Sequence, residues 1–209
     1  PPDPLFIEEL IENWELFARR EDLHPIIQTA VLHAQFEMIH PFLDGNGRMG
    51  RLLITLFLAS KKILHTPCLY ISAYLQRHRG AYYASLAKIS KNNDWNTWIS
   101  FFLRAVVEHS RANASLLMKM TDLYEISKTQ FAEATNSSLA MELLDYLFAQ
   151  PIFTVPNLIN QTKVKASKAT LLLAVQKLEK AGLVTKISEG RGRRPTVWKF
   201  GALVDLIQD

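Results

Sequence analysis

Residues 40–51 have the sequence His40-Pro-Phe-Leu-Asp44-Gly45-Asn46-Gly47-Arg48-Met-Gly-Arg51, a polar and glycine-rich segment between two apolar ones. Proline disfavours helix at the residue before it, so a helix that begins after Pro25 should end near His40. The next apolar stretch predicts a helix from about residue 48 to residue 61. The sequence therefore predicts a short loop between two helices, with the glycines directly before the second helix.

The residue types in this loop suit the binding of phosphate groups. Gly45-Asn46-Gly47 lets backbone N–H groups converge at a helix N-terminus, which attracts anions. Arg48 and Arg51 are three residues apart, so we expect them to share a helix face and reach neighbouring phosphate oxygens. Asp44 offers a carboxylate of the kind that binds Mg²⁺ together with substrate phosphates. His40 offers an imidazole that can accept a proton from a hydroxyl. The set predicts nucleotidyl or phosphoryl transfer.

Each of these features also has an ordinary structural explanation. A histidine before proline commonly caps a helix, and Gly-Asn-Gly alone usually marks a turn. Only their combination within twelve residues favours a functional site. The segment has no G-x-x-x-x-G-K-[ST] spacing, so it is not a P-loop. His33 and His40 are seven residues apart, a spacing that does not favour zinc.

The segment resembles the Fic family motif, H-P-F-x-[DE]-G-N-G-R-x-x-R, and matches every specified position. The resemblance covers most of residues 1–120 and includes His33-Ala-Gln-Phe-Glu37, Leu69-Tyr-Ile-Ser72, Tyr82-Tyr83 and residues 95–102. It implies an all-helical Fic core that binds ATP with Mg²⁺ and transfers AMP to a Ser, Thr or Tyr hydroxyl of a target protein, releasing pyrophosphate. The chain itself is a further target to be considered.

The resemblance also implies a role for each matching residue. His40 would be the general base, and Asp44 would hold Mg²⁺ across the α- and β-phosphates. Tyr82 and Tyr83 would lie against the adenosine, with packing in the protein core as the alternative. The other motif positions would contact phosphates: Gly45, Asn46 and Gly47 in the anion hole, and Arg48 and Arg51 at the distal phosphates.

Two other function classes remain open. One is a DNA-binding regulator whose Fic core senses nucleotide, although an intact His40 and Asp44 argue against a purely sensory core. The other is a Fic enzyme that removes AMP or transfers another phosphate-containing group. Many relatives carry an inhibitory helix, [ST]-x-x-x-E-[GN], and a flap that aligns the target. Thr185-Lys-Ile-Ser-Glu189-Gly190 matches the helix pattern where a strand is expected, so we interpret it as chance. We expect both elements to have been lost with a missing segment before Pro1.

The basic residues are concentrated in the last third of the chain. Residues 1–138 contain 14 basic and 14 acidic side chains, whereas residues 139–209 contain 10 and 6. The segment 131–138 is rich in Ala, Thr, Asn and Ser and predicts a linker between a Fic domain at 1–130 and a second domain at 139–209. Three predicted helices and two strands, at 183–187 and 196–200, indicate a winged helix-turn-helix. The expected fold class is mainly α.

This second domain offers candidate contacts to nucleic acid from its predicted recognition helix and wing: Lys168, Thr170, Lys177, Arg191, Arg193 and Arg194. Basic residues at a wing suit phosphate contacts, which give salt-dependent affinity. The run Leu171-Leu-Leu-Ala-Val175 is unusually apolar for a helix that enters a DNA groove. A homodimer contact or docking to a protein, including the Fic domain, is therefore the alternative to DNA binding.

Composition excludes several classes of protein. Cys68 is the only cysteine, so a disulfide-stapled secreted module is excluded. No apolar run approaches the roughly 20 residues that span a bilayer, and there is no signal peptide. We expect a soluble cytoplasmic protein without membrane contact.

Overall fold

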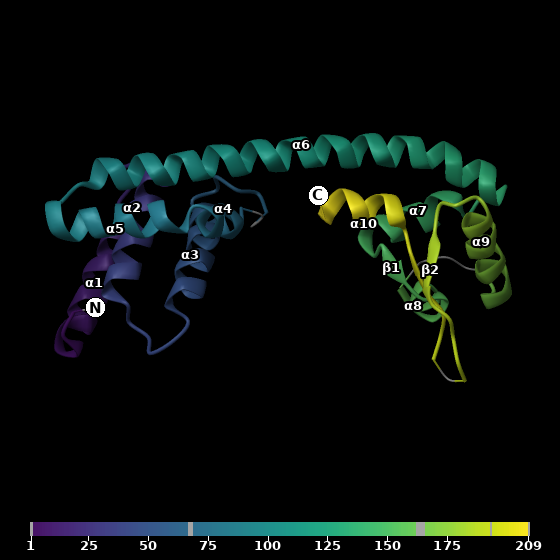
Figure 1. Ribbon diagram of the computed structural model, residues 1–209, viewed down its shortest axis with the longest axis horizontal. Coiled ribbons are helices and arrows are strands. Elements are labelled where there is room, and N and C mark those ends of the chain that lie inside the picture. The colour runs from purple at the N-terminus through teal and green to yellow at the C-terminus, as the bar shows by residue number, and fades with distance from the viewer. Residues whose placement is uncertain (1, 67–68, 162–165, 193, 209) are drawn as a thin grey trace. The chain divides into compact units, whose positions relative to one another are not determined.

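The computed structural model describes residues 2–66, 69–161, 166–192 and 194–208 (Figure 1). The chain divides into two compact units, Pro1–Asn113 and Ala114–Asp209, called here the N-terminal and C-terminal units. Helices account for most of the described residues, and a three-stranded sheet lies in the C-terminal unit. The expectation of a mainly helical fold is confirmed.

The described part of the N-terminal unit contains helices and no strand. A 3-10 turn precedes the first helix, and Asp3 caps it by accepting a hydrogen bond from the Leu5 N–H at 3.0 Å. The elements are η1 (Pro4–Phe6), α1 (Ile7–Ala18), α2 (Pro25–Ile39), α3 (Asn46–Ser60), α4 (Ser72–Arg77), α5 (Arg79–Asn92) and the first part of α6 (Trp95–Thr135). The predicted loop between two helices is confirmed, and α3 begins two residues earlier than expected.

A core of large apolar side chains holds these helices together. Trp98 and Phe102 of α6 are fully buried with Ile54 and Leu58 of α3. Trp98 also donates its indole N–H to the carbonyl of Ala30 at 2.8 Å, which fixes α2 against α6. Each such side chain contributes about 1.5–3 kcal/mol by leaving water. The loop between α2 and α3 lies at the ends of both helices, outside this core (Figure 1).

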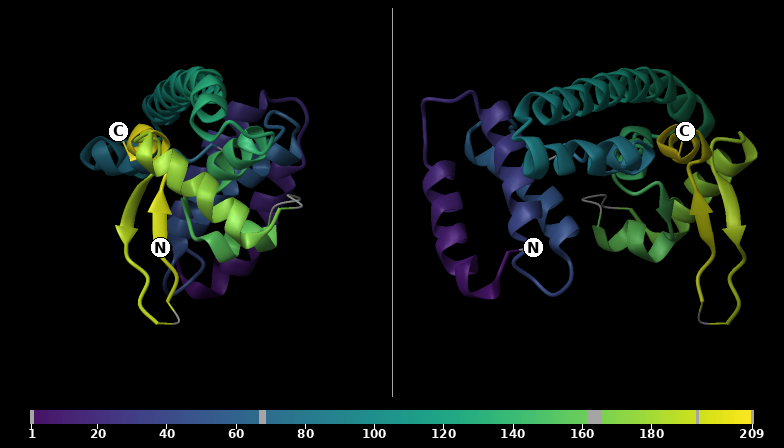
Figure 2. Two further views of the ribbon diagram at one scale, coloured as in Figure 1. Left: turned by 90° about the vertical axis from the view of Figure 1, so that its right-hand side faces the viewer. Right: turned by 60° about the vertical axis from the view of Figure 1, so that its left-hand side comes forward.

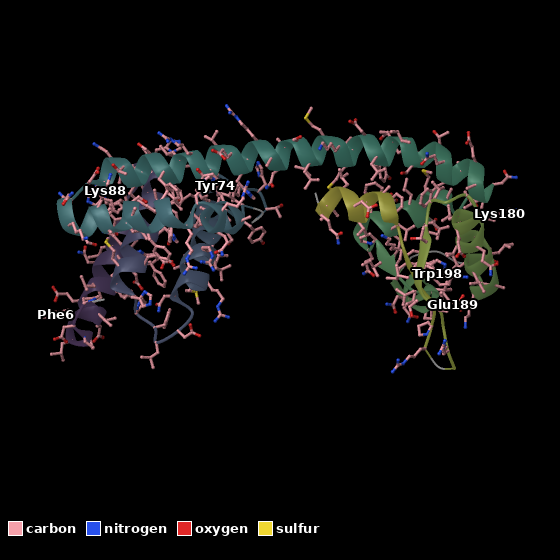
Figure 3. The ribbon with its side chains drawn as sticks, in the orientation of Figure 1. Phe6, Tyr74, Lys88, Lys180, Glu189 and Trp198 are labelled. Atoms are coloured by element: carbon pink, nitrogen blue, oxygen red, sulfur yellow. The ribbon has the colours of Figure 1, made fainter. Side chains whose placement is uncertain are left out.

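The C-terminal unit combines helices with a small antiparallel sheet. Its elements after α6 are α7 (Ala140–Ala149), β1 (Ile152–Phe153), α8 (Val155–Gln161), α9 (Lys168–Lys180), β2 (Thr185–Ser188), β3 (Val197–Lys199) and α10 (Gly201–Gln208). The strand order is β1-β3-β2, and Trp198 lies opposite Phe153 on one side and Lys186 on the other. Figure 2 shows β2 and β3 side by side as antiparallel strands. Trp198, labelled in Figure 3, is buried and stacks on Phe153.

The predicted linker at 131–138 differs from the structure. Helix α6 continues through Thr135, and the units divide between Asn113 and Ala114. Phe131 is fully buried and meets Phe200 edge-on at 5.6 Å, so this part of α6 belongs to the core of the C-terminal unit. Small and polar residues suggested a linker because they are weakly patterned, but one buried aromatic ring is enough to hold the helix in place. Among the described residues, no helix is long and apolar enough to cross a membrane.

Candidate active site

The backbone of the α2–α3 loop takes two left-handed conformations. His40 ends α2 with φ 53° and ψ 57°, and its N–H donates to the carbonyl of Phe36 at 3.0 Å. Gly45 precedes α3 with φ 86°. A left-handed backbone costs a residue with a side chain about 1 kcal/mol or more, and such residues concentrate at functional sites. The loop therefore keeps His40 in an unfavourable backbone conformation. At its second left-handed position the residue is a glycine, Gly45, which adopts this conformation at little cost.

Asn46 holds the loop in this shape. Its Oδ1 accepts a hydrogen bond from the Phe42 N–H at 2.9 Å, and its Nδ2 donates to the Phe42 carbonyl at 2.6 Å. The side chain is buried, and both its oxygen and its nitrogen bond to the Phe42 backbone. Asn46 thus has a structural role in the loop beside its predicted place in the anion hole.

The imidazole of His40 is exposed to solvent and oriented by its own helix. Its Nδ1 lies 3.3 Å from the backbone carbonyl of Glu37. When Nδ1 carries the proton and donates it to that carbonyl, Nε2 presents its lone pair and can accept a proton. This arrangement leaves Nε2 available as a proton acceptor.

The first turn of α3 supplies unpaired donors. Met49 N–H makes the first intrahelical bond, to Gly45 at 2.9 Å, so helix geometry leaves the N–H groups of Asn46, Gly47 and Arg48 without an intrahelical partner. Such groups, with the helix dipole, attract anions. The guanidinium of Arg48 lies 3.5 Å from the carboxylate of Asp44. Their side chains are 78% and 93% exposed, so this ion pair is weak and both groups remain available to a ligand.

The donor set at Asp44 fits Mg²⁺ held together with phosphates. Asp44 Oδ1 accepts a hydrogen bond from the Gly45 N–H at 2.7 Å, which fixes the carboxylate at the helix start. The described residues contain no cluster of three His, Cys, Asp or Glu side chains that could hold a metal ion unaided. Mg²⁺ commonly binds through one carboxylate plus substrate phosphates, so a single aspartate is sufficient in the presence of a nucleotide.

The two motif arginines line different hollows. Arg48 borders a shallow hollow of about 430 Å³ with Phe42, Asp44 and Gly45. Arg51 borders a polar cleft of about 480 Å³ that is also lined by Gln76, Arg79, Tyr82 and Tyr83. Each of the two arginines thus borders a hollow next to the first turns of α3. The structure does bring Arg51 and both predicted tyrosines to the same cleft.

The two tyrosines differ in environment. Tyr82 is buried, and its hydroxyl lies 3.1 Å from Nε2 of His33. Tyr83 is 55% exposed, and the guanidinium of Arg79 lies 5.5 Å from its ring centre. Tyr82 thus packs into the core as the alternative interpretation anticipated, whereas Tyr83 offers an accessible aromatic face. Sequence reasoning did not single out Arg79, although it lies four residues before Tyr83 on one helix.

A buried polar layer lies behind the motif and was not assigned from the sequence. His33 Nδ1 lies 3.1 Å from the carbonyl of Gly50, and the ring stacks on Trp98. Burial lowers the pKa of His33 to about 4, so the side chain is neutral at physiological pH. Glu37, one turn further on, is also largely buried, and burial raises the pKa of its carboxyl. The available signal was two titratable residues, His33 and Glu37, spaced by four on a helix that has no other titratable side chain.

The candidate nucleic-acid residues of the C-terminal unit are only partly available. Thr170 helps to cap α9, because its N–H donates to Ser167 Oγ at 3.1 Å. Lys177 donates its ammonium to the carbonyl of Thr135 at 2.8 Å. The five described candidates are all exposed to solvent, namely Lys168, Thr170, Lys177, Arg191 and Arg194, and Arg193 lies outside the described residues. Glu189, labelled in Figure 3, follows the end of β2, so the inhibitory-helix pattern falls on a strand and not on a helix.

Comparison with known proteins finds a family match in the part of the chain that contains the motif. Residues 1–58, which include α1, α2 and most of α3, match the Fic/DOC family. The N-terminal part of the chain is therefore similar to the Fic/DOC family over these residues.

Two curated relatives are named as adenylyltransferases. The chain is 35% identical over 86 residues to a probable protein adenylyltransferase of Aquifex aeolicus (strain VF5), an alignment that covers 39% of this chain and 27% of the relative. It is 27% identical over 101 residues to the protein adenylyltransferase Fic of Drosophila grimshawi, covering 48% and 20%. The chain thus spans about a quarter or less of the length of these relatives.

A solved structure shares the fold. The chain is similar to a Fic family protein from Desulfovibrio desulfuricans G20, with a TM-score of 0.54, 21% identity, and coverage of 95% of this chain and 56% of that one. At this identity the similarity concerns the fold alone.

Proposed function

We propose that the protein is a protein adenylyltransferase that transfers AMP from ATP to a Ser, Thr or Tyr hydroxyl of a target protein. The observation that carries the proposal is the α2–α3 loop, which presents His40, Asp44 and Arg48 around the N-terminus of α3. The adenylyltransferase names of two relatives support it. An intact histidine and carboxylate disfavour a core that only senses nucleotide.

In this proposal His40 handles the proton. The hydroxyl oxygen of the target attacks the α-phosphorus of ATP, and Nε2 of His40 accepts the hydroxyl proton. The bond from the α-phosphorus to its bridging oxygen breaks, and pyrophosphate leaves. The carbonyl of Glu37 keeps the proton of the imidazole on Nδ1, so that Nε2 is free for this task.

The phosphate charge is neutralised by backbone and side chains together. The N–H groups at the start of α3, with Arg48 and Arg51, stabilise charge on the phosphate oxygens as pyrophosphate departs. Asp44 would hold Mg²⁺, which supplies further charge neutralisation at the phosphates. The exposed ring of Tyr83 suits stacking on the adenine in the cleft beside Arg51.

Mass spectrometry tests the proposal. The protein is incubated with Mg²⁺ and ATP, alone and with a cell lysate, and tryptic peptides are searched for an added AMP on a hydroxyl side chain. We expect the modification on a lysate protein, on the chain itself, or on both. Removal of AMP from pre-modified proteins, without transfer from ATP, would instead assign the reverse reaction and contradict the proposal.

We further propose that the C-terminal unit is a winged-helix domain that binds duplex DNA. The order α7, α8, α9 followed by the β2–β3 hairpin is the observation that favours this fold. Lys168 on α9 and Arg191 and Arg194 in the hairpin are exposed and suit contacts to the phosphate backbone. Leu173 of α9 is also exposed, which is the feature that favours docking to a protein or a homodimer contact.

Salt-dependent DNA binding tests the second proposal. We expect measurable affinity for duplex DNA at low salt and a steep loss at moderate salt. The double variant Arg191→Ala/Arg194→Ala should lower the salt slope by about two, because each lost phosphate contact lowers it by about one. Absence of binding at low salt would overturn the DNA proposal in favour of docking to a protein.

A further inference from the structure

The largely buried carboxylate of Glu37 lies next to two glycines in the first turns of α3, Gly47 and Gly50. Its side chain is 13% exposed, and its Oε1 is buried without a hydrogen-bond partner among the described residues. A Cβ atom placed on Gly50 would lie only 2.6 Å from this oxygen, and one placed on Gly47 would lie 3.9 Å away. Glycine at position 50 therefore makes the room that the carboxylate occupies.

The guanidinium of Arg51, on the second turn of α3, also lies next to Gly47. Its Nη1 lies 3.2 Å from the Cβ position of Gly47. Within the described ranges, Arg51 makes no ion pair within 4 Å. Arg51 nevertheless lowers the pKa of Glu37 against the effect of burial, so the two charges interact. Two groups of opposite charge thus flank one glycine, and each has unused hydrogen-bonding capacity.

We propose that Glu37 is a positioning residue that holds Arg51 for binding of the nucleotide phosphates. The two groups form no ion pair in this structure; in the proposal the carboxylate attracts the guanidinium and orients it toward the polar cleft that Arg51 lines. A guanidinium has five donors in a rigid fork, so it can bind a carboxylate and a phosphate at the same time. Glu37 itself touches no substrate. This inference rests on the proposed adenylyltransferase function.

The other groups around Glu37 oppose its burial less strongly than Arg51 does. On α2, His33 Nε2 lies 4.0 Å from Glu37 Oε1, but that histidine is neutral at physiological pH. His40, on the same helix, and Tyr82, on α5, act on the Glu37 pKa in the same direction as Arg51 but less strongly. Arg51 on α3 is thus the largest opposing influence on the buried carboxyl.

The variant Glu37→Gln keeps the shape of the side chain and removes its charge. We expect it to raise the Kd and the KM for Mg-ATP about tenfold, the equivalent of one charge-assisted hydrogen bond, with kcat changed less than threefold. In an Arg51→Gln background the same substitution should change the Kd less than twofold. Glu12→Gln, an exposed carboxylate on α1, is the matched control and should leave both constants unchanged.

The pH dependence separates positioning from packing. Burial raises the pKa of Glu37, so the carboxyl becomes neutral as the pH falls, at a higher pH than an ordinary glutamate. The Kd ratio of Glu37→Gln to the unmodified protein should therefore decrease toward one as the pH is lowered. Protonation of ATP itself affects both proteins equally and cancels from this ratio. A ratio that stays constant with pH would contradict the proposal.

A ligand-free experiment distinguishes failure of this inference from failure of the proposed function. Urea unfolding of Glu37→Gln, Arg51→Gln and the double variant measures the coupling between the two residues. We expect the shift in midpoint of the double variant to differ from the sum of the single shifts. Such non-additivity without AMP transfer would retain the positioning role and reject the adenylyltransferase. Additive shifts with an unchanged ATP affinity in Glu37→Gln would overturn the positioning role.

Discussion

At the scale of single residues, His40 combines an unfavourable backbone with an oriented side chain. Replacement with alanine removes the proton acceptor but leaves the N–H groups of α3 and both arginines in place. We therefore expect His40→Ala to bind ATP within a few-fold of the unmodified protein and to transfer AMP about 100-fold more slowly or worse. Calorimetric titration with Mg-ATP and transfer from radiolabelled ATP measure the two quantities. His65→Ala, an exposed histidine outside the loop, is the control, and equal transfer rates for the two variants would reject His40 as the base.

Gly45 is required for its backbone conformation and not for space. No atom lies within 4 Å of the position of an added Cβ, but φ is 86°. Gly45→Ala should therefore lower the free energy of unfolding by about 1 kcal/mol through backbone strain alone. Gly80→Ala is the matched control, since that position in α5 is equally open without a positive φ and should gain about 0.5 kcal/mol. Urea unfolding measures both, and a gain in stability for Gly45→Ala would show that the loop conformation is not as described.

The lowered pKa of the buried His33 predicts how the free energy of unfolding depends on pH. Its pKa is about 4 in the folded protein against an ordinary 6.5, so the unfolded chain binds a proton between these values that the folded chain does not. Stability therefore falls as the pH decreases through this window, by about 3 kcal/mol in total. Glu37 acts in the opposite direction, because its raised pKa favours the folded state on acidification. The comparison must therefore be made against His33→Gln, which retains Glu37.

The difference in free energy of unfolding between the unmodified protein and His33→Gln should shrink as the pH falls from 7 to 5. Urea unfolding at each pH measures it. A difference that stays constant over this range would mean that the His33 side chain accepts a proton without unfolding.

At the scale of elements, the sequence predicts best where strong local signals agree. Proline at the start of α2 and after its end, together with the apolar stripe between them, sets that helix within a residue. β1 was not predicted, because two residues give no alternation to detect and the strand exists only by pairing with β3. The role of Glu37 was also not visible, because it depends on Gly47, Gly50 and Arg51 from the next helix. Local sequence patterns thus locate the motif, whereas the contacts that position its side chains become visible only in the tertiary structure.

Lys177 illustrates the same limit in the C-terminal unit. Its charge suggested a DNA contact, yet its ammonium satisfies the carbonyl of Thr135, the last residue of α6. Last-turn carbonyls lack intrahelical partners and carry the negative end of the helix dipole, so this bond is favourable. Lys177→Ala should lower the free energy of unfolding of this unit by about 1 kcal/mol.

Lys180→Ala is the control for that experiment, because it makes the same change of helix propensity at an exposed position of α9. Thermal unfolding followed by circular dichroism compares the two variants. Equal stability would show that the bond between Lys177 and Thr135 contributes nothing in solution.

At the scale of the whole molecule, the proposed active site and the excess of basic residues lie in different units. The proposed active site lies entirely within Pro1–Asn113, whereas the basic helix and hairpin lie within Ala114–Asp209. Among the residues that the structure describes, the two hydrophobic cores have none in common, although α6 contributes to both. The sequence places the motif and the basic excess in separate parts of the chain. It misplaced the boundary because α6 continues through the composition change.

Separate cores predict two unfolding transitions in scanning calorimetry. Mg-ATP at about 100 times its Kd should stabilise the N-terminal unit by about 2.7 kcal/mol and raise only that transition, because the ligand binds one folded unit. Leu144→Ala, in the core of the C-terminal unit, should lower only the other transition, since loss of a buried leucine costs about 2–5 kcal/mol. Ile54→Ala is the reciprocal variant and should lower the ATP-sensitive transition. A single transition that all three changes move together would show that the chain unfolds as one cooperative body, with α6 coupling the two cores.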